Sequence, residues 1–551
     1  MSPAPAQATW TKPGPGTWEL DRSHCSAAPG PIQRDLYEHA LATGMKEGLD
    51  RFGSPLSHME MRWVHGKFYR RLVPAVGGNA DLPDPPRAVM WLATRLHPEL
   101  RRRERLAGET LRTKRWMEEI ERWEREWKPQ LLETNRAFAA VDVAAIDDAA
   151  LAEHVEALAG HLLESTTLHF RLHVSDMGPL GMLMVRLEDW GLHRDDTFRA
   201  LVAASPATRG PAEQLAAIAD AVAAAGVDLD ALHDLDAVRQ TSPDAAHRLD
   251  AFLADHGWRL TTGYDIEDRC LIELPDVVLT AIRAARASRR VDDDHHQHVL
   301  DGLRAEIPDE HLTAFDEAVA DARASYGLRD ENGPLTYEWP AGLLRRALLE
   351  AGNRLAGVGA LAEAADVFEL RAHEVAALLV GSPGPSLEEV AERAATRRWE
   401  AALDPPARLG REATPPPIGA LTPNLAYMTR VILTVVGSLE TDPHGAALRG
   451  TGVGSEPYSG TARVVHDAAE ALAQVEPGDI IVAPYTAPTY NAVLGMAGAI
   501  VTEEGGLLCH AAVIARELGL PAVIGARGAM SEIRDGSRVE VDPVAGVVRL
   551  L

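Results

Sequence analysis

Prolines crowd one short segment of this chain, and that segment limits how the rest can fold. A helix cannot continue through it, because proline lacks a backbone N–H and fixes φ. Before the segment, apolar residues recur mainly at helical spacing; after residue 450, short alternating stretches are typical of an α/β unit. The sequence therefore predicts a multidomain protein that changes fold class here. The prolines are Pro405, Pro406, Pro415, Pro416, Pro417 and Pro423.

Four regions are expected. Residues 1–30 are rich in proline and glycine and predict an irregular N-terminal arm, and residues 31–403 predict a large, mostly α-helical domain. Residues 404–449 form a proline-rich linker and connecting element, in which 428–436 fit a helix or a strand equally well. Residues 450–551 predict a compact α/β domain. A chain of 551 residues is too long for a single hydrophobic core, which agrees with this division.

The periodicity also predicts individual elements. Helices are expected within residues 87–138 and at 147–177, 211–225, 275–307, 310–326, 342–356 and 387–402. Strands are expected at residues 460–465, 479–484, 499–502, 522–524, 538–541 and 546–550.

Composition excludes several classes of protein. The net charge is −26 and the basic residues are almost all arginine, so neither nucleic acid nor an anionic membrane is expected as a partner. The three cysteines lie far apart, which predicts neither a disulfide framework nor a zinc site. No stretch is apolar enough for a membrane span and no signal peptide is evident. A cytoplasmic location is the expectation.

The most informative run spans residues 500–523. It predicts a strand, a glycine turn at Gly505 and Gly506, a helix that begins near His510, and a second strand after Pro521. Unpaired backbone N–H groups and the positive end of the helix dipole gather at a helix N-terminus, where they favour an anion and disfavour an imidazolium. His510 is therefore expected to be a neutral nucleophile beside a phosphate-binding turn.

This run resembles the swivelling phosphohistidine domain of phosphoenolpyruvate synthase, pyruvate phosphate dikinase and rifampicin phosphotransferase, a β/β/α unit. The resemblance covers essentially all of residues 450–551. It implies that His510 is the catalytic residue that becomes phosphorylated. Cys509 stands where the family usually has a hydroxyl, and a thiol is a weaker cap and donor. The implied phosphate-binding residues are Thr502, Gly505, Gly506 and Cys509.

Two other interpretations of the run stay open. The domain could be a decayed carrier in which His510 only caps a helix, although the intact glycines argue against this. Cys509 could perform thiol chemistry, but no second cysteine lies nearby.

The helical region resembles, more loosely, the substrate domain of rifampicin phosphotransferase-like proteins. Those relatives also contain an ATP-grasp domain that charges the histidine, and no such domain is apparent in this helical, lysine-poor sequence. The resemblance therefore implies a separate ATP-grasp partner that holds ATP and Mg²⁺, with no cofactor or metal held by this chain. The segments that carry the resemblance are 256–259, 326–330, 343–352 and 366–370.

Delivery of a phosphoryl group requires cations around it and a base or orienting group for the acceptor. Candidates for the first role are Arg329, Arg345 and Arg346, of which adjacent Arg345 and Arg346 point about 100° apart on a helix. A solvated helix face is the alternative for each. Candidates for the second role are His169 and His173, which extend an apolar helical stripe and so should point inward.

Other residues around the expected acceptor site have two interpretations each. His169 and His173 are more simply core or pocket-lining residues, and no third metal ligand accompanies them. Trp258 and its neighbour Arg259 could line a ligand pocket or serve packing alone. The acidic, histidine-rich tract at 292–298 resembles a metal tract in composition, but an exposed linker explains it better.

Together these observations predict a phosphotransferase subunit. His510 would carry a phosphoryl group from the nucleotide site of the ATP-grasp partner to a small-molecule hydroxyl bound in the helical domain. Two alternatives stay open: a dehydratase that phosphorylates a hydroxyl and then eliminates it, and a non-catalytic binding or regulatory protein that retains the fold.

Overall fold

The structure is a computed structural model, and its described residues fall into two compact units. Unit 1 comprises Met1–Asp176, Gly263–Asp268 and Asn332–Arg430, and unit 2 comprises Met177–Thr262, Arg269–Glu331 and Val431–Leu551. The helical region expected at 31–403 is thus divided between both units. The described residues are 8–21, 28–77, 81, 85–192, 206–260, 265–287, 300–411, 417–439, 448–454, 456–466, 468–486, 490–506 and 509–551.

Unit 1 contains a small sheet of order β2-β3-β1-β4, which the sequence analysis did not predict. Strands β2 (Leu56–Val64) and β3 (Lys67–Pro74) form an antiparallel hairpin. The two turn residues, His65 and Gly66, have φ of 48° and 68°, as in a type I′ turn, which suits the twist of a hairpin. Strands β1 (Trp18–Leu20) and β4 (Arg408–Leu409) complete the sheet, so the expected irregular arm contributes a strand.

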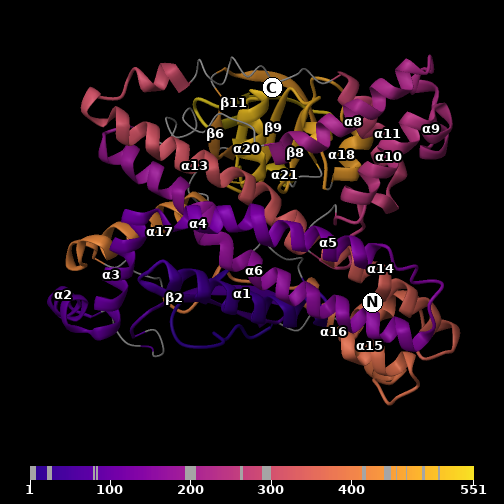
Figure 1. The fold of residues 1–551 in the computed structure, drawn as a ribbon, viewed down its shortest axis with the longest axis horizontal. Coiled ribbons are helices and arrows are strands. Elements are labelled where there is room, and N and C mark those ends of the chain that lie inside the picture. Colours follow the sequence, from indigo (N-terminus) through magenta and orange to yellow (C-terminus); the bar gives the residue numbers. More distant parts are fainter. Residues whose placement is uncertain are drawn as a thin grey trace. The chain divides into compact units, whose positions relative to one another are not determined.

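Helices make up the rest of unit 1 (Figure 1). Two of them, α6 (Asp148–Asp189) and α17 (Pro423–Leu439), begin in unit 1 and end in unit 2. Helix α13 (Leu312–Gly333) begins in unit 2 and ends in unit 1. The other helices of unit 1 are α1 (Pro31–Arg51), α2 (Arg87–Leu96), α3 (Pro98–Thr113), α4 (Arg115–Arg122), the π-helix η1 (Trp123–Trp127), α5 (Lys128–Ala139), the π-helix η5 (Pro334–Glu338), α14 (Trp339–Gly357), η6 (Ala364–Glu369), α15 (Ala372–Leu379), α16 (Leu387–Ala401) and η7 (Ile418–Ala420).

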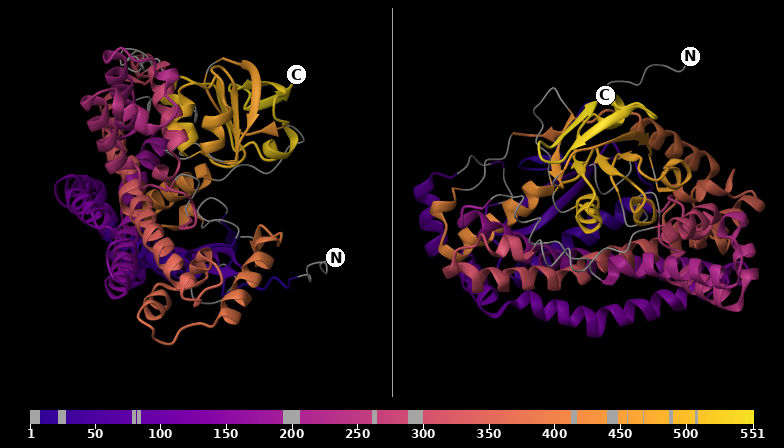
Figure 2. Two further views of the ribbon diagram at one scale, coloured as in Figure 1. Left: turned by 90° about the vertical axis from the view of Figure 1, so that its right-hand side faces the viewer. Right: turned by 90° about the horizontal axis from the view of Figure 1, so that it is seen from above.

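Unit 2 combines a helical part with an eight-stranded sheet. The helical part adds α8 (Pro206–Ala224), η2 (Leu229–Ala231), α9 (Leu235–Thr241), α10 (Pro243–His256), η3 (Leu271–Glu273), α11 (Pro275–Ala287) and η4 (Asp309–His311). The sheet has the order β5-β12-β11-β7-β8-β9-β10-β6 (Figure 2). Its strands are β5 (Leu448–Arg449), β6 (Thr451–Val453), β7 (Tyr458–Val464), β8 (Ile480–Ala483), β9 (Ala499–Thr502), β10 (Ala522–Ile524), β11 (Arg538–Asp542) and β12 (Val547–Leu550).

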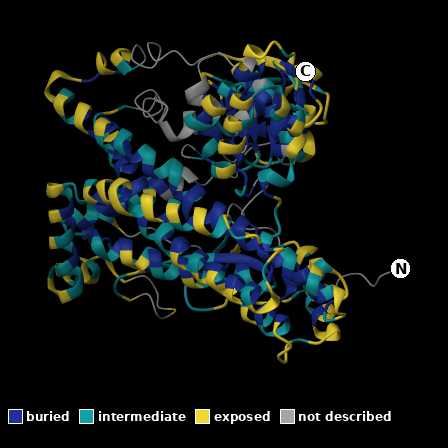
Figure 3. Ribbon diagram, turned by 45° about the vertical axis from the view of Figure 1, so that its right-hand side comes forward, coloured by how far each residue is buried: buried dark blue, intermediate teal, exposed yellow. Residues whose placement is uncertain are grey.

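Strands β7, β8, β9 and β10 are parallel to one another and form the buried centre of this sheet. All residues of β8, β9 and β10 are buried, as the dark blue arrows of Figure 3 show. Alternate residues enter different cores: Ile480 and Val482 lie in one, and Ile481 in the other. Both faces are therefore covered, which is usual for parallel strands. The helices that accompany the sheet are α18 (Ala468–Gln474), α19 (Asn491–Leu494), α20 (His510–Leu518) and α21 (Ala529–Glu532).

Most of the expected elements are confirmed. Strands β9 and β10 have the predicted bounds, and the others differ by one or two residues at an end. The ambiguous stretch 428–436 lies in helix α17. Helix α6 continues twelve residues past its expected end at 177, through Pro179. Within the described residues, none of the helices has both the length and the apolar character needed to cross a bilayer.

Candidate functional site

His510 lies at the edge of the sheet where the parallel strands of unit 2 end. The loop after β8 contains Thr486, the loop after β9 leads to His510, and Gly525 follows β10. Because these strands are parallel, their carboxyl ends meet at one edge, the usual position of ligand sites in α/β sheets. The fold therefore brings three separate loops to the histidine.

Backbone hydrogen bonds prolong the pairing of β8 with β9 beyond the strands. Glu503 N–H donates to the carbonyl of Ala483 at 3.0 Å, and Glu504 N–H donates to that of Pro484 at 2.8 Å. The two chain segments thus leave the sheet side by side. This pairing fixes the loop of Thr486 next to the loop that leads into α20.

A hydrogen bond joins His510 to Thr486: Nδ1 and the threonine Oγ1 are 2.8 Å apart. Thr486 is 8% exposed and His510 is partly exposed. The hydrogen-bond partner of one ring nitrogen of a histidine decides the chemistry of the other, here Nε2. Thr486 was not predicted from the sequence. Its only signal was its position two residues after Pro484, at the end of an expected strand.

The electrostatic surroundings keep His510 neutral. Burial, and after it the positive charge of Arg329, together lower its pKa to about 3. The site therefore provides an unprotonated imidazole across the physiological pH range, as expected for the helix N-terminus. Arg329, which the sequence analysis named as a phosphoryl-binding cation, belongs to α13 in the same unit as His510.

We expect the ring of His510 not to titrate between pH 5 and pH 8. Its pKa is lowered in the folded state, whereas an unfolded histidine titrates near 6.5, so folding excludes a proton between these values. His510 therefore stabilises the fold fully above about pH 6.5, and this contribution declines as the pH falls toward 3. NMR titration of the ring checks this, with the resonance assigned by its loss in His510→Asn. A midpoint near pH 6.5 would contradict the burial of the ring.

Gly505 is required by the turn that precedes α20. Its φ is +111°, a conformation that L side chains rarely adopt. An added Cβ would also lie 2.8 Å from the Sγ of Cys509 and 3.2 Å from the side chain of Ile524. The turn is closed further by Cys509 N–H, which donates to the carbonyl of Gly506 at 3.0 Å. Cys509 is partly exposed and forms no disulfide with another described residue.

Thr502 faces the protein interior. It is fully buried, and its Oγ1 accepts a weak hydrogen bond from the N–H of Gly525 at 3.4 Å. Its carbonyl also accepts from Ala526 N–H at 2.7 Å. Thr502 thus ties the loop after β10 to the end of β9. Its phosphate-binding role stays an expectation from the resemblance.

The two candidate histidines of unit 1 lie together on α6. Their ring centroids are 4.5 Å apart. His173 Nδ1 is 3.3 Å from the Oδ2 of Asp176, and His169 Nδ1 is 3.2 Å from the Oγ1 of Thr336. The sequence analysis named both histidines but missed the partners, Asp176, Thr336 and Asn332. A signal for Asp176 was its position three residues after His173, one helical turn on.

The remaining candidate residues have backbone partners or partly buried positions. Arg345 donates to the carbonyl of Glu267 at 2.8 Å, and Arg346 donates to the carbonyls of residues 138, 139 and 141, near the end of α5. The two arginines of α14 therefore reach different neighbours, as their adjacent positions predict. Trp258 is partly buried in the turn after α10, in unit 2.

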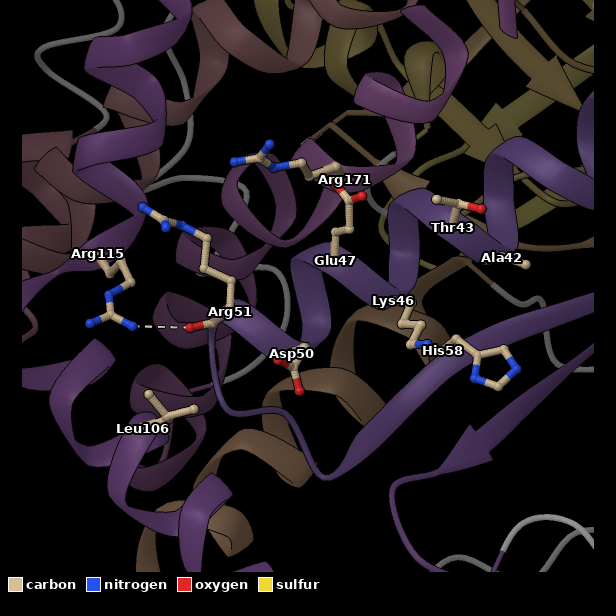
Figure 4. Close-up of a pocket in the computed structure, with 10 residues that line it drawn as sticks. All are labelled: Ala42, Thr43, Lys46, Glu47, Asp50, Arg51, His58, Leu106, Arg115 and Arg171. Atoms are coloured by element: carbon tan, nitrogen blue, oxygen red, sulfur yellow. Dashed lines mark hydrogen bonds between the residues drawn. The ribbon is translucent and has the colours of Figure 1, made fainter. Parts of the chain in front are cut away.

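Unit 1 also contains an open pocket of about 890 Å³ (Figure 4). Its cations are largely paired: Arg51 and Arg171 both approach Glu119, at 2.6 Å and 3.4 Å. Arg115 pairs with Glu109 and donates to the carbonyl of Arg51. The lining has four Lys or Arg side chains against two carboxylates, and the two glutamates that pair with its arginines lie outside the lining. It consists of Ala42, Thr43, Lys46, Glu47, Asp50, Arg51, His58, Leu106, Arg115 and Arg171.

Among the described residues, no group of three or more His, Cys, Asp or Glu side chains is arranged to hold a metal ion. The acidic, histidine-rich tract at 292–298 lies outside the described residues.

Two segments of the chain match known families. Residues 475–546 match the family described as PEP-utilising enzyme, mobile domain, and residues 170–330 match the rifampicin phosphotransferase fourth domain. The first match includes His510, and the second includes most of the helical part of unit 2. These matches confirm the two resemblances predicted from the sequence.

The similar proteins are longer than this chain. A rifampicin phosphotransferase from a Streptomyces species is 33% identical over 320 residues, which cover 55% of this chain and 34% of the relative. Phosphoenolpyruvate synthase from Aeropyrum pernix is 30% identical over 51% of this chain and 30% of the relative. Chondramide synthase cmdD from Chondromyces crocatus is 31% identical over 55% of this chain and 8% of the relative. The chain thus spans about a third or less of these relatives' lengths.

Proposed function

We propose that this chain is a phosphotransferase subunit. The Nε2 atom of its His510 accepts a phosphoryl group and delivers it to a small-molecule hydroxyl. The hydrogen bond between His510 Nδ1 and Thr486 carries this proposal. With Nδ1 as the donor to the threonine oxygen, Nε2 holds the lone pair and is the nucleophile. The lowered pKa keeps that lone pair free of a proton at neutral pH.

Charging of His510 is a nucleophilic displacement at phosphorus. Nε2 forms a bond to the phosphorus atom, the bond from phosphorus to the leaving oxygen of the donor breaks, and its electron pair departs with that oxygen. The positive charge of Arg329, which acts on His510, favours the anionic phosphoryl group in the same place. The N-terminus of α20 adds backbone N–H groups that have no acceptor within the helix.

The name of one relative supports the kind of acceptor, and the separate donor site is part of the proposal. A rifampicin phosphotransferase is named for a small-molecule acceptor, which supports a small-molecule hydroxyl as the acceptor of this chain. The ATP site is assigned to a separate ATP-grasp partner that binds ATP and Mg²⁺. A histidine that alternates between two distant sites needs a covalent intermediate and a mobile domain.

Radiolabelled ATP tests the proposal. The full chain is incubated with [γ-³²P]ATP, with [β-³²P]ATP, or with labelled phosphoenolpyruvate, each with and without candidate ATP-grasp proteins of the source organism. We expect acid-labile, base-stable label on the peptide that contains His510, and only when an ATP-grasp protein is present. Label without any partner would overturn the split between two proteins, and no label under any condition would overturn the carrier function.

We expect Thr486→Val to slow the charging of His510 by about tenfold to a hundredfold, because loss of one hydrogen bond to the ring amounts to about 1–3 kcal/mol. Valine has nearly the same shape as threonine, so packing is conserved. Thr486→Ser retains the hydroxyl and is the matched control. The measurement is the rate at which acid-labile label accumulates. Equal rates for the valine variant and the wild type would show that the ring needs no partner at Nδ1.

A further inference from the structure

A polar cluster in unit 1 contains a histidine and a buried carboxylate on adjacent turns of α6. Nδ1 of His173 and Oδ2 of Asp176 are 3.3 Å apart. Asp176 is 2% exposed, whereas the side chain of His173 is 25% exposed. An ionised carboxylate only accepts hydrogen bonds, so Nδ1 carries the proton and Nε2 of His173 holds the lone pair. Within the described residues, no hydrogen bond engages that Nε2 atom.

A third residue fixes the carboxylate. Asn332, which is 1% exposed, donates from Nδ2 to the backbone carbonyl of His169 at 3.1 Å and to Asp176 Oδ2 at 3.4 Å. The other carboxylate oxygen, Oδ1, is buried and has no hydrogen-bond partner among the described residues. A buried carboxylate that is only partly satisfied lowers stability. Its presence is better explained by an effect on His173 than by a contribution to folding.

The segment that faces these histidines has an unusual backbone. Residues Pro334–Glu338 form a π-helix, η5, and such turns occur frequently at functional sites. Thr336 of this π-helix is fully buried, and its Oγ1 approaches Nδ1 of His169 at 3.2 Å. Both histidine rings are therefore held through Nδ1, although they lie on successive turns of α6.

We propose that His173 is the general base for the acceptor hydroxyl, and that Asp176 and Asn332 are the residues that position it. This inference rests on the proposed phosphotransferase function. A positioned histidine with a carboxylate at Nδ1 is the arrangement in which Nε2 removes a proton efficiently, because the carboxylate stabilises the imidazolium that forms. The fixed position of its ring and the neighbouring carboxylate thus distinguish His173 from a histidine that only fills the core.

The transfer step balances with these groups. The acceptor oxygen forms a bond to phosphorus, and the bond between phosphorus and Nε2 of His510 breaks. Its electron pair returns to the imidazole ring of His510. The acceptor proton passes to Nε2 of His173, and the resulting imidazolium is paired with Asp176.

The test separates charging from delivery. Full-length wild type, His173→Gln and Asp176→Asn are charged with ³²P on His510 by the ATP-grasp partner and freed of nucleotide. Loss of the label is then followed with water as the probe acceptor, because water presents the same O–H group to the base. We expect His173→Gln to slow label loss by about 10²-fold or more and Asp176→Asn by about tenfold, with charging unchanged in both. His154→Gln, which alters another buried histidine of α6, is the matched control.

A second readout reports on the ring itself. Diethyl pyrocarbonate acylates an unprotonated imidazole nitrogen, and mass spectrometry of the peptide gives the rate for His173. We expect this rate to fall several-fold in Asp176→Asn, while the rate for exposed His466 is unchanged. Equal label loss in wild type and His173→Gln would overturn the assignment of the base, and an unchanged acylation rate would overturn the role of Asp176. Failure of charging itself would instead count against the proposed function.

Discussion

We expect His510→Ala to abolish the charging of the chain, with a fall of about 10⁴-fold or more in the rate of label incorporation. Removal of a covalent nucleophile eliminates the intermediate, whereas removal of a supporting group only slows its formation. The ring also lies at a helix N-terminus, forms a hydrogen bond with the buried hydroxyl of Thr486 and is subject to the positive charge of Arg329. Incorporation of ³²P into acid-labile form is the measurement.

Two control variants show whether the loss of charging is specific to the nucleophile. His466→Ala changes a histidine of the same unit that is 72% exposed and contacts only Glu470 among the described residues, so charging should be unaffected. His510→Asn keeps a polar side chain of similar reach at the N-terminus of α20, which separates loss of the nucleophile from disturbance of the helix. Charging that persists in either variant of His510 would move the carrier role to another residue.

The strands and the carrier histidine could be predicted because their signals are local. Strand β9, the turn at Gly505 and the helix that begins at His510 follow one another in the sequence, and each has its own pattern. Thr486 could not be predicted in the same way. It lies 24 residues from His510 and reaches the ring only because β8 and β9 pair in parallel.

The hairpin of β2 and β3 was missed although the sequence contains a local signal for it: polar and apolar residues alternate in β2 from His58 to Trp63. The division of the helical region, in contrast, depends on contacts that no local pattern contains. The long helical region divides between two units because α6 and α13 each pass from one unit to the other without a break in periodicity. Only the proline-rich segment could be recognised in the sequence as a boundary between domains.

Glu119 of α4 is the second site with a large expected effect, this time on stability. Its side chain is 1% exposed, and its Oε1 lies 2.6 Å from Nε of Arg51 and 3.4 Å from a guanidinium nitrogen of Arg171. One buried carboxylate thus joins α1, α4 and α6 through Arg51 and Arg171, two of the residues that line the open pocket of Figure 4. Arg171 also lies over the ring of Trp127, 5.1 Å from its centroid, which holds the guanidinium in place.

We therefore expect Glu119→Gln to lower the free energy of unfolding by about 2 kcal/mol. Loss of one partner of a buried ion pair costs about 3–5 kcal/mol, and the partial exposure of Arg51 reduces this figure. The matched control is Glu118→Gln: Glu118 also pairs with Arg51, at 3.3 Å, but it is 60% exposed, and its loss should change stability by about 0.5 kcal/mol or less. Urea denaturation followed by circular dichroism compares the two variants. Equal effects would mean that burial adds nothing to this ion pair.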